Sequence, residues 1–151
     1  MKNRSLIMVL TMLGAPGIAA ASSYDLAVSE YNFAVNELSK TSYNQAAIIG
    51  QDGTNNSAQL RQDGSKMHAV ISQEGASNRA KIDQAGAYNF AYIDQSGSAN
   101  DASITQGSYG NTAMIIQKGS GNKANITQYG TQKTAVVVQR QSQMAIRVIQ
   151  R

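Results

Sequence analysis

The sequence predicts an all-β protein, a β-solenoid with cross-β pairing, built from five 22-residue coils that each contain a strand, a turn and a second strand. A motif with alanine, isoleucine and glutamine at alternate positions recurs at a constant 11-residue step without an insertion, as in Ala80-Lys81-Ile82-Asp83-Gln84. Apolar and polar residues alternate along each motif, which is typical of a β-strand. A fixed repeat of this kind indicates stacked units that bury one continuous core.

The motif supplies three columns of residues that we expect to point inward. Glutamine ends every unit: Gln51, Gln62, Gln73, Gln84, Gln95, Gln106, Gln117, Gln128, Gln139 and Gln150. Two positions earlier stands an aliphatic residue: Ile49, Leu60, Ile71, Ile82, Ile93, Ile104, Ile115, Ile126, Val137 and Val148. Two positions earlier again stands Ala47, Ala58, Ala69, Ala80, Ala91, Ala102, Ala113, Ala124, Ala135 or Ile146.

We expect the inward amides to form ladders along the stack. A buried amide without a partner is costly, and the same residue one coil above or below can satisfy it. Four asparagines, which recur in every second unit, extend these ladders beside the second strand: Asn56, Asn78, Asn100 and Asn122.

Turn residues follow each motif. Glycine stands two positions after glutamine at Gly53, Gly64, Gly75, Gly86, Gly97, Gly119 and Gly130, and Ser108 and Gln141 replace it in two units. Asparagine and serine gather after these glycines, and such residues tolerate the positive φ of tight turns. Each unit is therefore expected to be one short strand followed by one turn.

The outward residues indicate that each coil holds two motif units and not one. A strand of five or six residues advances about 17–20 Å, so a second strand must bring the chain back. Outward residues before the aliphatic position alternate between an apolar set, Ile48, Val70, Tyr92, Met114 and Val136, and a polar set, Gln59, Lys81, Ser103, Asn125 and Arg147. The predicted coils are 44–65, 66–87, 88–109, 110–131 and 132–151. A plain antiparallel meander is the competing fold.

Residues 1–21 are expected to be a secretory signal peptide. Lys2 and Arg4 precede a short apolar core, and Ala19-Ala20-Ala21 offers a cleavage site after Ala21. A buried helix is the alternative for this segment. Residues 22–43 have no clean period, and they are either a flexible leader or an address for an export machine.

Charge is concentrated in the last coil. The chain has a formal net charge of +4, which becomes +2 without Lys2 and Arg4. The four basic residues after residue 130, Lys133, Arg140, Arg147 and Arg151, have no acidic neighbour in that segment, so residues 22–130 carry −2. A nucleic-acid partner for the whole protein is therefore not expected, and the basic end coil is a candidate anchor.

The sequence contains no catalytic or metal-binding constellation, so neither an enzyme nor a cofactor is expected. Cysteine is absent, and the single histidine, His68, is placed in a predicted turn. Asp83, Asp94 and Asp101 do not match the calcium-binding β-roll, whose nine-residue repeat carries aspartate in each turn. A surface-binding solenoid, such as an adhesin, remains a second function class.

The repeat from Gln73 to Gln84, Gln-x-Gly-x-x-Asn-x-Ala-x-Ile-x-Gln, resembles the curlin repeat of enterobacterial curli. This resemblance covers the chain and implies a functional amyloid that is secreted unfolded through an outer-membrane pore with accessory factors. It then assembles at the cell surface into fimbriae for adhesion and biofilm. Within the family, the chain is similar to a nucleator in three features. These are the signal peptide, the leader read by the secretion apparatus and the atypical basic end coil. Such a nucleator templates the major curlin subunit and also polymerises with itself. A major fibre-forming subunit is the alternative within the family.

A mechanism for templating follows from the ends of the solenoid. The first and last coils leave strand edges unpaired, and an incoming chain with the same columns can add strands there. Which end templates stays open at this level. Outward acids resemble gatekeepers against premature assembly: Asp52, Asp63, Glu74, Asp83 and Asp94.

Overall fold

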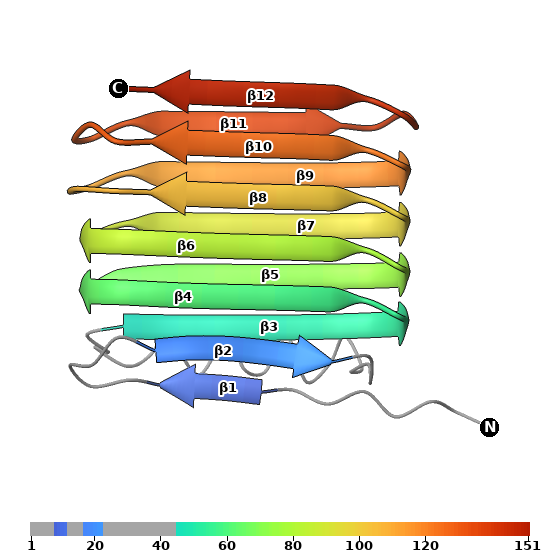
Figure 1. Cartoon of the computed structure of the whole chain (residues 1–151), viewed down its shortest axis with the longest axis horizontal. Coiled ribbons are helices and arrows are strands. Elements are labelled where there is room, and N and C mark those ends of the chain that lie inside the picture. Colours follow the sequence, from blue (N-terminus) through green and yellow to red (C-terminus); the bar gives the residue numbers. More distant parts are fainter. Residues whose placement is uncertain (1–7, 12–16, 23–44) are drawn as a thin grey trace.

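The computed structural model describes residues 8–11, 17–22 and 45–151, with side chains described for 45–151. Figure 1 shows a flat stack of strands running back and forth. The strands are β1 (Met8–Thr11), β2 (Gly17–Ser22), β3 (Gln45–Thr54), β4 (Ser57–Ser65), β5 (Met67–Ala76), β6 (Arg79–Ala87), β7 (Phe90–Ser98), β8 (Asp101–Gln106), β9 (Thr112–Ser120), β10 (Lys123–Gln128), β11 (Thr134–Gln139) and β12 (Ala145–Gln150).

The strands form two six-stranded sheets, one with the odd-numbered and one with the even-numbered strands. From β3 to β12 every pairing is parallel and joins equivalent residues of successive coils, for example Ile49 with Ile71 and Ile82 with Ile104. The predicted β-solenoid is confirmed. The antiparallel meander is wrong for these coils, because each strand pairs with its equivalent in the next coil and not with its neighbour in sequence.

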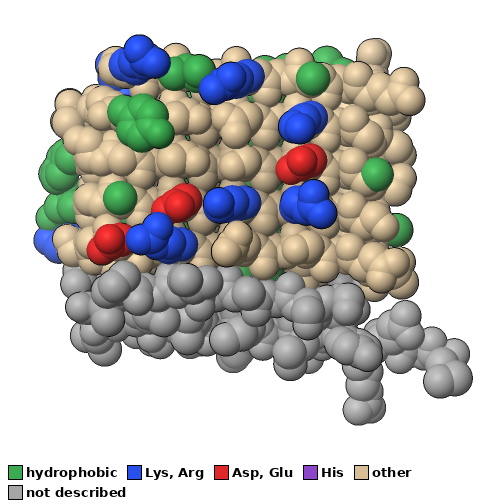
Figure 2. All heavy atoms as spheres, in the orientation of Figure 1, with side chains coloured by type: hydrophobic (Ala, Val, Ile, Leu, Met, Phe, Trp, Pro, Cys, Tyr) green, Lys and Arg blue, Asp and Glu red, His purple; other side chains and the backbone are tan. Residues whose placement is uncertain are grey.

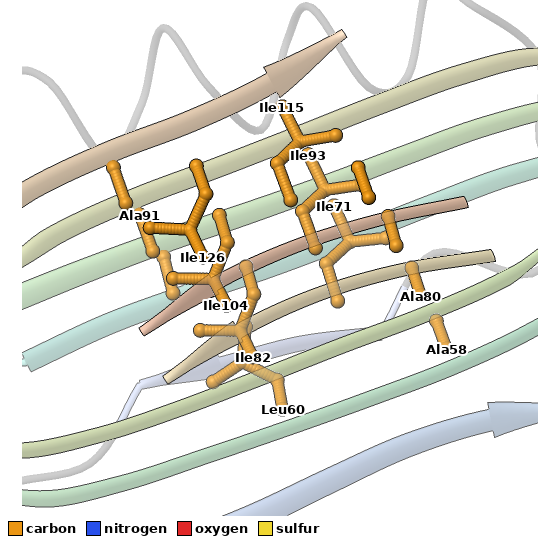
Figure 3. Close-up of a cluster of buried hydrophobic side chains, with 14 of the residues drawn as sticks. Ala58, Leu60, Ile71, Ala80, Ile82, Ala91, Ile93, Ile104, Ile115 and Ile126 are labelled. Carbon is orange, nitrogen blue, oxygen red and sulfur yellow. The ribbon is translucent and has the colours of Figure 1, made fainter. Parts of the chain in front are cut away.

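The core is a thin layer between the two sheets. The inward alanine and aliphatic columns are buried from Ala47 to Val137, and Figure 3 shows the isoleucines of both sheets facing one another. Burying each isoleucine contributes roughly 1.5–3 kcal/mol. Ile146 and Val148 of the last coil are only partly buried against this core.

The strands are longer than expected. β3 to β7 have 9 or 10 residues and continue through the glycines that the sequence placed in turns. The chain reverses after them, at non-glycine residues with positive φ such as Asn55, Ser77 and Ala99. Where glycine is replaced the strand is shorter: β8 ends at Gln106, before Ser108, and β11 ends at Gln139, before Gln141.

Two N-terminal strands lie against the first coil. β1 pairs antiparallel with β3, and β2 pairs antiparallel with β4 (Figure 1). The alternative considered for residues 1–21 was a buried helix, and the described parts of this segment form strands. The predicted leader, apart from Ser22, lies outside the described residues. The described part of the chain holds no helix long and apolar enough to cross a membrane.

Candidate assembly interface

The inward glutamines form two continuous amide ladders, one in each sheet. In the odd sheet, Gln51 donates through Nε2 to Oε1 of Gln73 at 2.6 Å, and Gln73 donates to Gln95 at 2.8 Å. The same contact continues along both columns through Gln62, Gln84, Gln95, Gln106, Gln117, Gln128, Gln139 and Gln150. Nε2 of Gln73 also donates to Ser57 O at 3.1 Å, in the other strand of the preceding coil. Each ladder glutamine therefore joins its own coil to the next one.

The glutamine ladders have a direction. In every contact the Nε2 donor belongs to the earlier coil and the Oε1 acceptor to the later coil. The last coil therefore ends each ladder with an amide donor, and the first coil begins it with an acceptor. Among the described atoms, Oε1 of Gln51 and Oε1 of Gln45 are buried without a hydrogen-bond partner.

The buried asparagines bind backbone and do not bind one another. Nδ2 of Asn78 donates to Glu74 O at 3.1 Å and to Gly97 O in the next coil at 3.0 Å. Its Oδ1 accepts the backbone N–H of Asn100 at 3.1 Å. Contacts of these kinds to the next coil are also made by Asn56, Asn100 and Asn122. Asparagine thus fixes the turn of its own coil and holds the turn of the following one.

Two further asparagines belong to this set, and the sequence reasoning missed them. Asn89 and Asn111 are buried, and Asn89 donates to Ala85 O at 2.9 Å and to Ser108 O at 3.1 Å. Both lie five positions after a ladder glutamine, as Asn78 does, so the constant step of the motif already contained the signal. The set is interrupted by Met67 and ends before Lys133 and Met144.

The glycines allow the coils to approach closely at the strand ends. A Cβ on Gly53 would lie 1.8 Å from Gly75 O, and one on Gly75 would lie 2.0 Å from Gly97 O. Both glycines also have positive φ. The predicted turn set Gly53, Gly64, Gly75, Gly86, Gly97 and Gly119 lies within strands, and Gly130 lies beyond β10. The role of the strand glycines is therefore close stacking, because a side chain there would meet the next coil.

The predicted anchoring residues lie on the last coil. Arg140, Arg147 and Arg151 are exposed, and Lys133 is half-buried. Figure 2 shows basic side chains along the β12 edge of the face in view. Within residues 45–151, one ion pair is found elsewhere, between Arg61 and Asp83 at 3.9 Å.

The outward acids have different surroundings. Asp52, Asp63 and Glu74 are exposed, and Asp83 and Asp94 are half-buried. Burial raises the pKa of the Asp94 carboxyl above its usual value; Lys118 opposes this, Glu74 adds to it, and a hydrogen bond from Ser72 opposes it. Ionisation of the Asp94 carboxyl is therefore costly in the stack.

The described residues hold no group of three or more metal-ligating side chains. His68 does not lie in a turn as expected: it is exposed on β5, in register with Ala46 and Phe90, because the strand begins one residue before it. Asp83, Asp94 and Asp101 lie on three successive strands, β6, β7 and β8, and not in one cluster. The chemistry that this surface offers is strand and amide pairing.

Aromatic residues at the turns form a small cluster that the sequence analysis did not single out. Lys66 Nζ donates a hydrogen bond to the Tyr88 hydroxyl and lies 4.7 Å from the centroid of the Tyr88 ring. The rings of Tyr88 and Tyr109 are 5.0 Å apart. The hydrogen bond to Tyr88 raises the pKa of Lys66. These contacts link the turns of successive coils at the surface.

Comparisons with known proteins agree with the geometry. The family model of the curlin associated repeat matches residues 53–86, 75–107 and 108–130. The minor curlin subunit of Escherichia coli (strain K12) is 83% identical over 57 residues, and that of Salmonella typhimurium is 78% identical over 57 residues. Each match covers 38% of this chain and 38% of the relative. No solved structure matches the chain.

Proposed function

We propose a function for this chain from the premise that it belongs to the family of proteins built from curlin associated repeats. It is a structural amyloid subunit of curli, and within the fibre it nucleates polymerisation of the major curlin subunit at the bacterial surface. The similarity to minor curlin subunits supports the second part of this proposal.

The observation that carries the proposal is the pair of unbroken glutamine ladders in a parallel, in-register stack. A solenoid of this kind ends in strand edges that have no further coil. An incoming disordered chain with glutamine and isoleucine at the same spacing can pair with such an edge and continue both ladders. About ten backbone hydrogen bonds at roughly 0.5–1.5 kcal/mol each offset much of the ordering entropy of one coil. The barrier to nucleation falls accordingly.

Export and attachment complete the proposal. Residues 1–21 direct the chain across the inner membrane, and residues 22–43 are the address read by the secretion pore and its accessory factors. The basic last coil, with Arg140, Arg147 and Arg151 exposed, holds the protein to the anionic cell surface. Deleting 22–43 is expected to block surface delivery and to leave assembly of the repeats in solution intact.

A seeding assay tests the nucleating function. The exported chain is added in small amounts to purified major curlin, and fibre formation is followed by thioflavin T fluorescence. We expect the lag phase to disappear. The matched control is Gly75→Ala, which prevents close stacking of two coils, and it should leave most of the lag in place. An unchanged lag with the wild-type chain would refute nucleation.

A further inference from the structure

We infer that the solenoid templates from one end only. The first coil, at the edge formed by β3 and β4, receives the last coil of an incoming repeat chain, and the fifth coil disfavours such stacking. This inference rests on the proposed nucleating function and gives it a direction.

The first coil presents unmet hydrogen-bond acceptors. The Gln51 side chain is 2% exposed, its Nε2 donates to Gln73, and its Oε1 has no partner among the described atoms. Gln45 is buried at 1% exposure and its Oε1 is likewise unpaired within the described part of the chain. An amide oxygen without a partner at a strand edge is an acceptor with which an incoming donor can pair. The group that fits Gln51 Oε1 is a glutamine Nε2 one coil below, since that is the donor in every other step of the ladder.

The strands that cover this edge do not continue the pattern. β1 and β2 pair antiparallel with β3 and β4, whereas all later pairings are parallel. Cleavage after Ala21 removes β1 and every residue of β2 except Ser22. In the exported chain these antiparallel partners no longer occupy the β3 and β4 edges.

The fifth coil lacks the asparagines that hold a following coil. Asn111 and Asn122 accept the backbone N–H groups of Lys133 and Met144, both at 3.0 Å. Lys133 and Met144 occupy the asparagine positions of the last coil. A sixth coil would therefore find neither the Oδ1 acceptor nor the Nδ2 donor that the asparagines of the earlier coils, such as Asn78, offer to the next turn.

The fifth coil also lacks the glycine that permits close approach. Gln141 follows Gln139 at the glycine position, and pairing of β11 with β9 stops at Gln139. In the preceding coil, pairing of β9 with β7 continues to Ser120. A Cβ at this position of the earlier coils, as on Gly53 or Gly75, would lie 1.8 Å or 2.0 Å from the next carbonyl oxygen. Ser108 replaces this glycine and Met67 replaces one asparagine in earlier coils, and the next coil still stacks there. The fifth coil differs because it lacks the glycine and both asparagines together, which disfavours a sixth coil.

The partner that fits the first coil is thus a curlin-repeat chain whose own last coil keeps the glutamine, glycine and asparagine positions. A second copy of this chain does not offer such a coil. The protein is consequently suited to begin a stack and poorly suited to continue one, which separates a nucleator from a fibre-forming subunit.

Tethering tests the direction. The chain has no cysteine, so a single Asn44→Cys or Arg151→Cys substitution in the exported protein allows attachment to a surface by either end. The soluble probe is a fluorescent copy with its last coil repaired by Lys133→Asn, Gln141→Gly and Met144→Asn. We expect clearly faster growth on chains held through residue 151, whose first coil is free. Equal growth on both surfaces, or faster growth on chains held through residue 44, would overturn the inference.

A matched probe carries Lys133→Ala, Gln141→Ala and Met144→Ala, which change the same positions without restoring the pattern. The alanine probe and the wild-type probe should both add slowly to either surface. If either of them adds as fast as the repaired probe, the inference is also overturned. Gln141→Gly alone is the second probe if the triple variant does not fold. Major curlin is absent from this experiment, so a failed seeding assay would refute nucleation without affecting the measured direction.

Discussion

A primary amide suits a repeating stack because it carries both a donor and an acceptor. Gln73 uses this capacity fully: it accepts from Gln51, donates to Gln95 and donates to Ser57 O. A hydrophobic residue would fill the same space but would not distinguish one register from another. The ladder therefore fixes register, because a slip of one residue would bury unpaired amides.

Removing one ladder amide is expected to be costly. Gln73→Ala leaves Nε2 of Gln51 and Oε1 of Gln95 without their partners, and each unsatisfied buried group costs about 1–3 kcal/mol. We expect a several-fold loss of seeding activity toward major curlin and a lower resistance of the solenoid to denaturant. The matched control is Gln59→Ala, an exposed glutamine on the outer face of β4, which should change neither by much. Asn78→Ala is expected to behave like Gln73→Ala; similar losses from Gln59→Ala would contradict the role of the ladder.

The glycines give a second expectation at this scale. Gly75→Ala places a methyl group 2.0 Å from Gly97 O at a φ of 109°, so the coils must separate. We expect a loss of about 2 kcal/mol or more in stability. In Gly107→Ala the φ is ordinary and the nearest atom is a Tyr129 ring carbon at 3.3 Å, which can move. Denaturant titration of the two variants compares them, and equal loss would mean that close approach is unimportant.

At the level of single residues, the sequence predicts the columns well and their bonding poorly. Alternation and the constant spacing suffice to assign Ile82 and Gln84 to one face. The direction of the ladder depends on how each amide is rotated, and no pattern of residue types contains that. The interpretation of Gly53 as a turn residue failed because glycine also permits close backbone approach, and the two uses have the same sequence signature.

Among the elements, β7 carries the outward acid Asp94, whose pKa is raised by burial. Asp94 lies in register with Ser72 of β5 and Ile116 of β9, and Glu74 and Lys118 on those strands are its charged neighbours. The raised pKa means that the folded carboxyl binds a proton more readily than the unfolded one. Its contribution to stability is full below the ordinary value of 3.8 and is lost as pH rises through the folded pKa.

Assembly should therefore accelerate on acidification from about pH 7 to about pH 4. Asp94→Asn should assemble faster than wild type at neutral pH and should depend less on pH. Asp52→Asn removes an exposed acid from the same sheet and should keep the wild-type dependence. The measurement is the lag time of assembly for each variant across this pH range. If Asp94→Asn keeps the wild-type pH dependence, that dependence arises from a group other than Asp94.

The strands also explain which part of the fold could be predicted. The apolar residues Ile48, Val70 and Tyr92 recur in alternate units, which predicts two strands in each coil. The structure agrees, because Ile48 pairs with Val70 and Val70 pairs with Tyr92. The exposure of that set is uneven, because Ile48 is 4% exposed and Val136 is 56% exposed. Strand length could not be predicted, since it depends on whether a neighbouring coil also has glycine at the same place.

On the scale of the whole molecule, the two ends of the solenoid differ in chemistry. The first coil has the full inward pattern, and the last coil has partly buried Ile146 and Val148, no asparagine at the turn positions and a concentration of positive charge. A stack with two different ends can hold a surface at one end and extend at the other. Residues 132–151 are thus a candidate for the end that faces the cell.

Neutralising the last coil should separate attachment from templating. We expect Arg140→Gln, Arg147→Gln and Arg151→Gln together to leave the seeding rate nearly unchanged, because all three side chains are exposed and outside the ladders. The variant should be found mainly in the medium, since attraction to an anionic surface is lost. The matched control removes three charges elsewhere, by Arg61→Gln, Arg79→Gln and Lys81→Gln, and should remain on the cell. Immunoblots of cell and medium fractions provide the measurement. If the variant of the last coil stays on the cell, charge there is not the anchor, and residues 22–43 become the segment that attaches the protein.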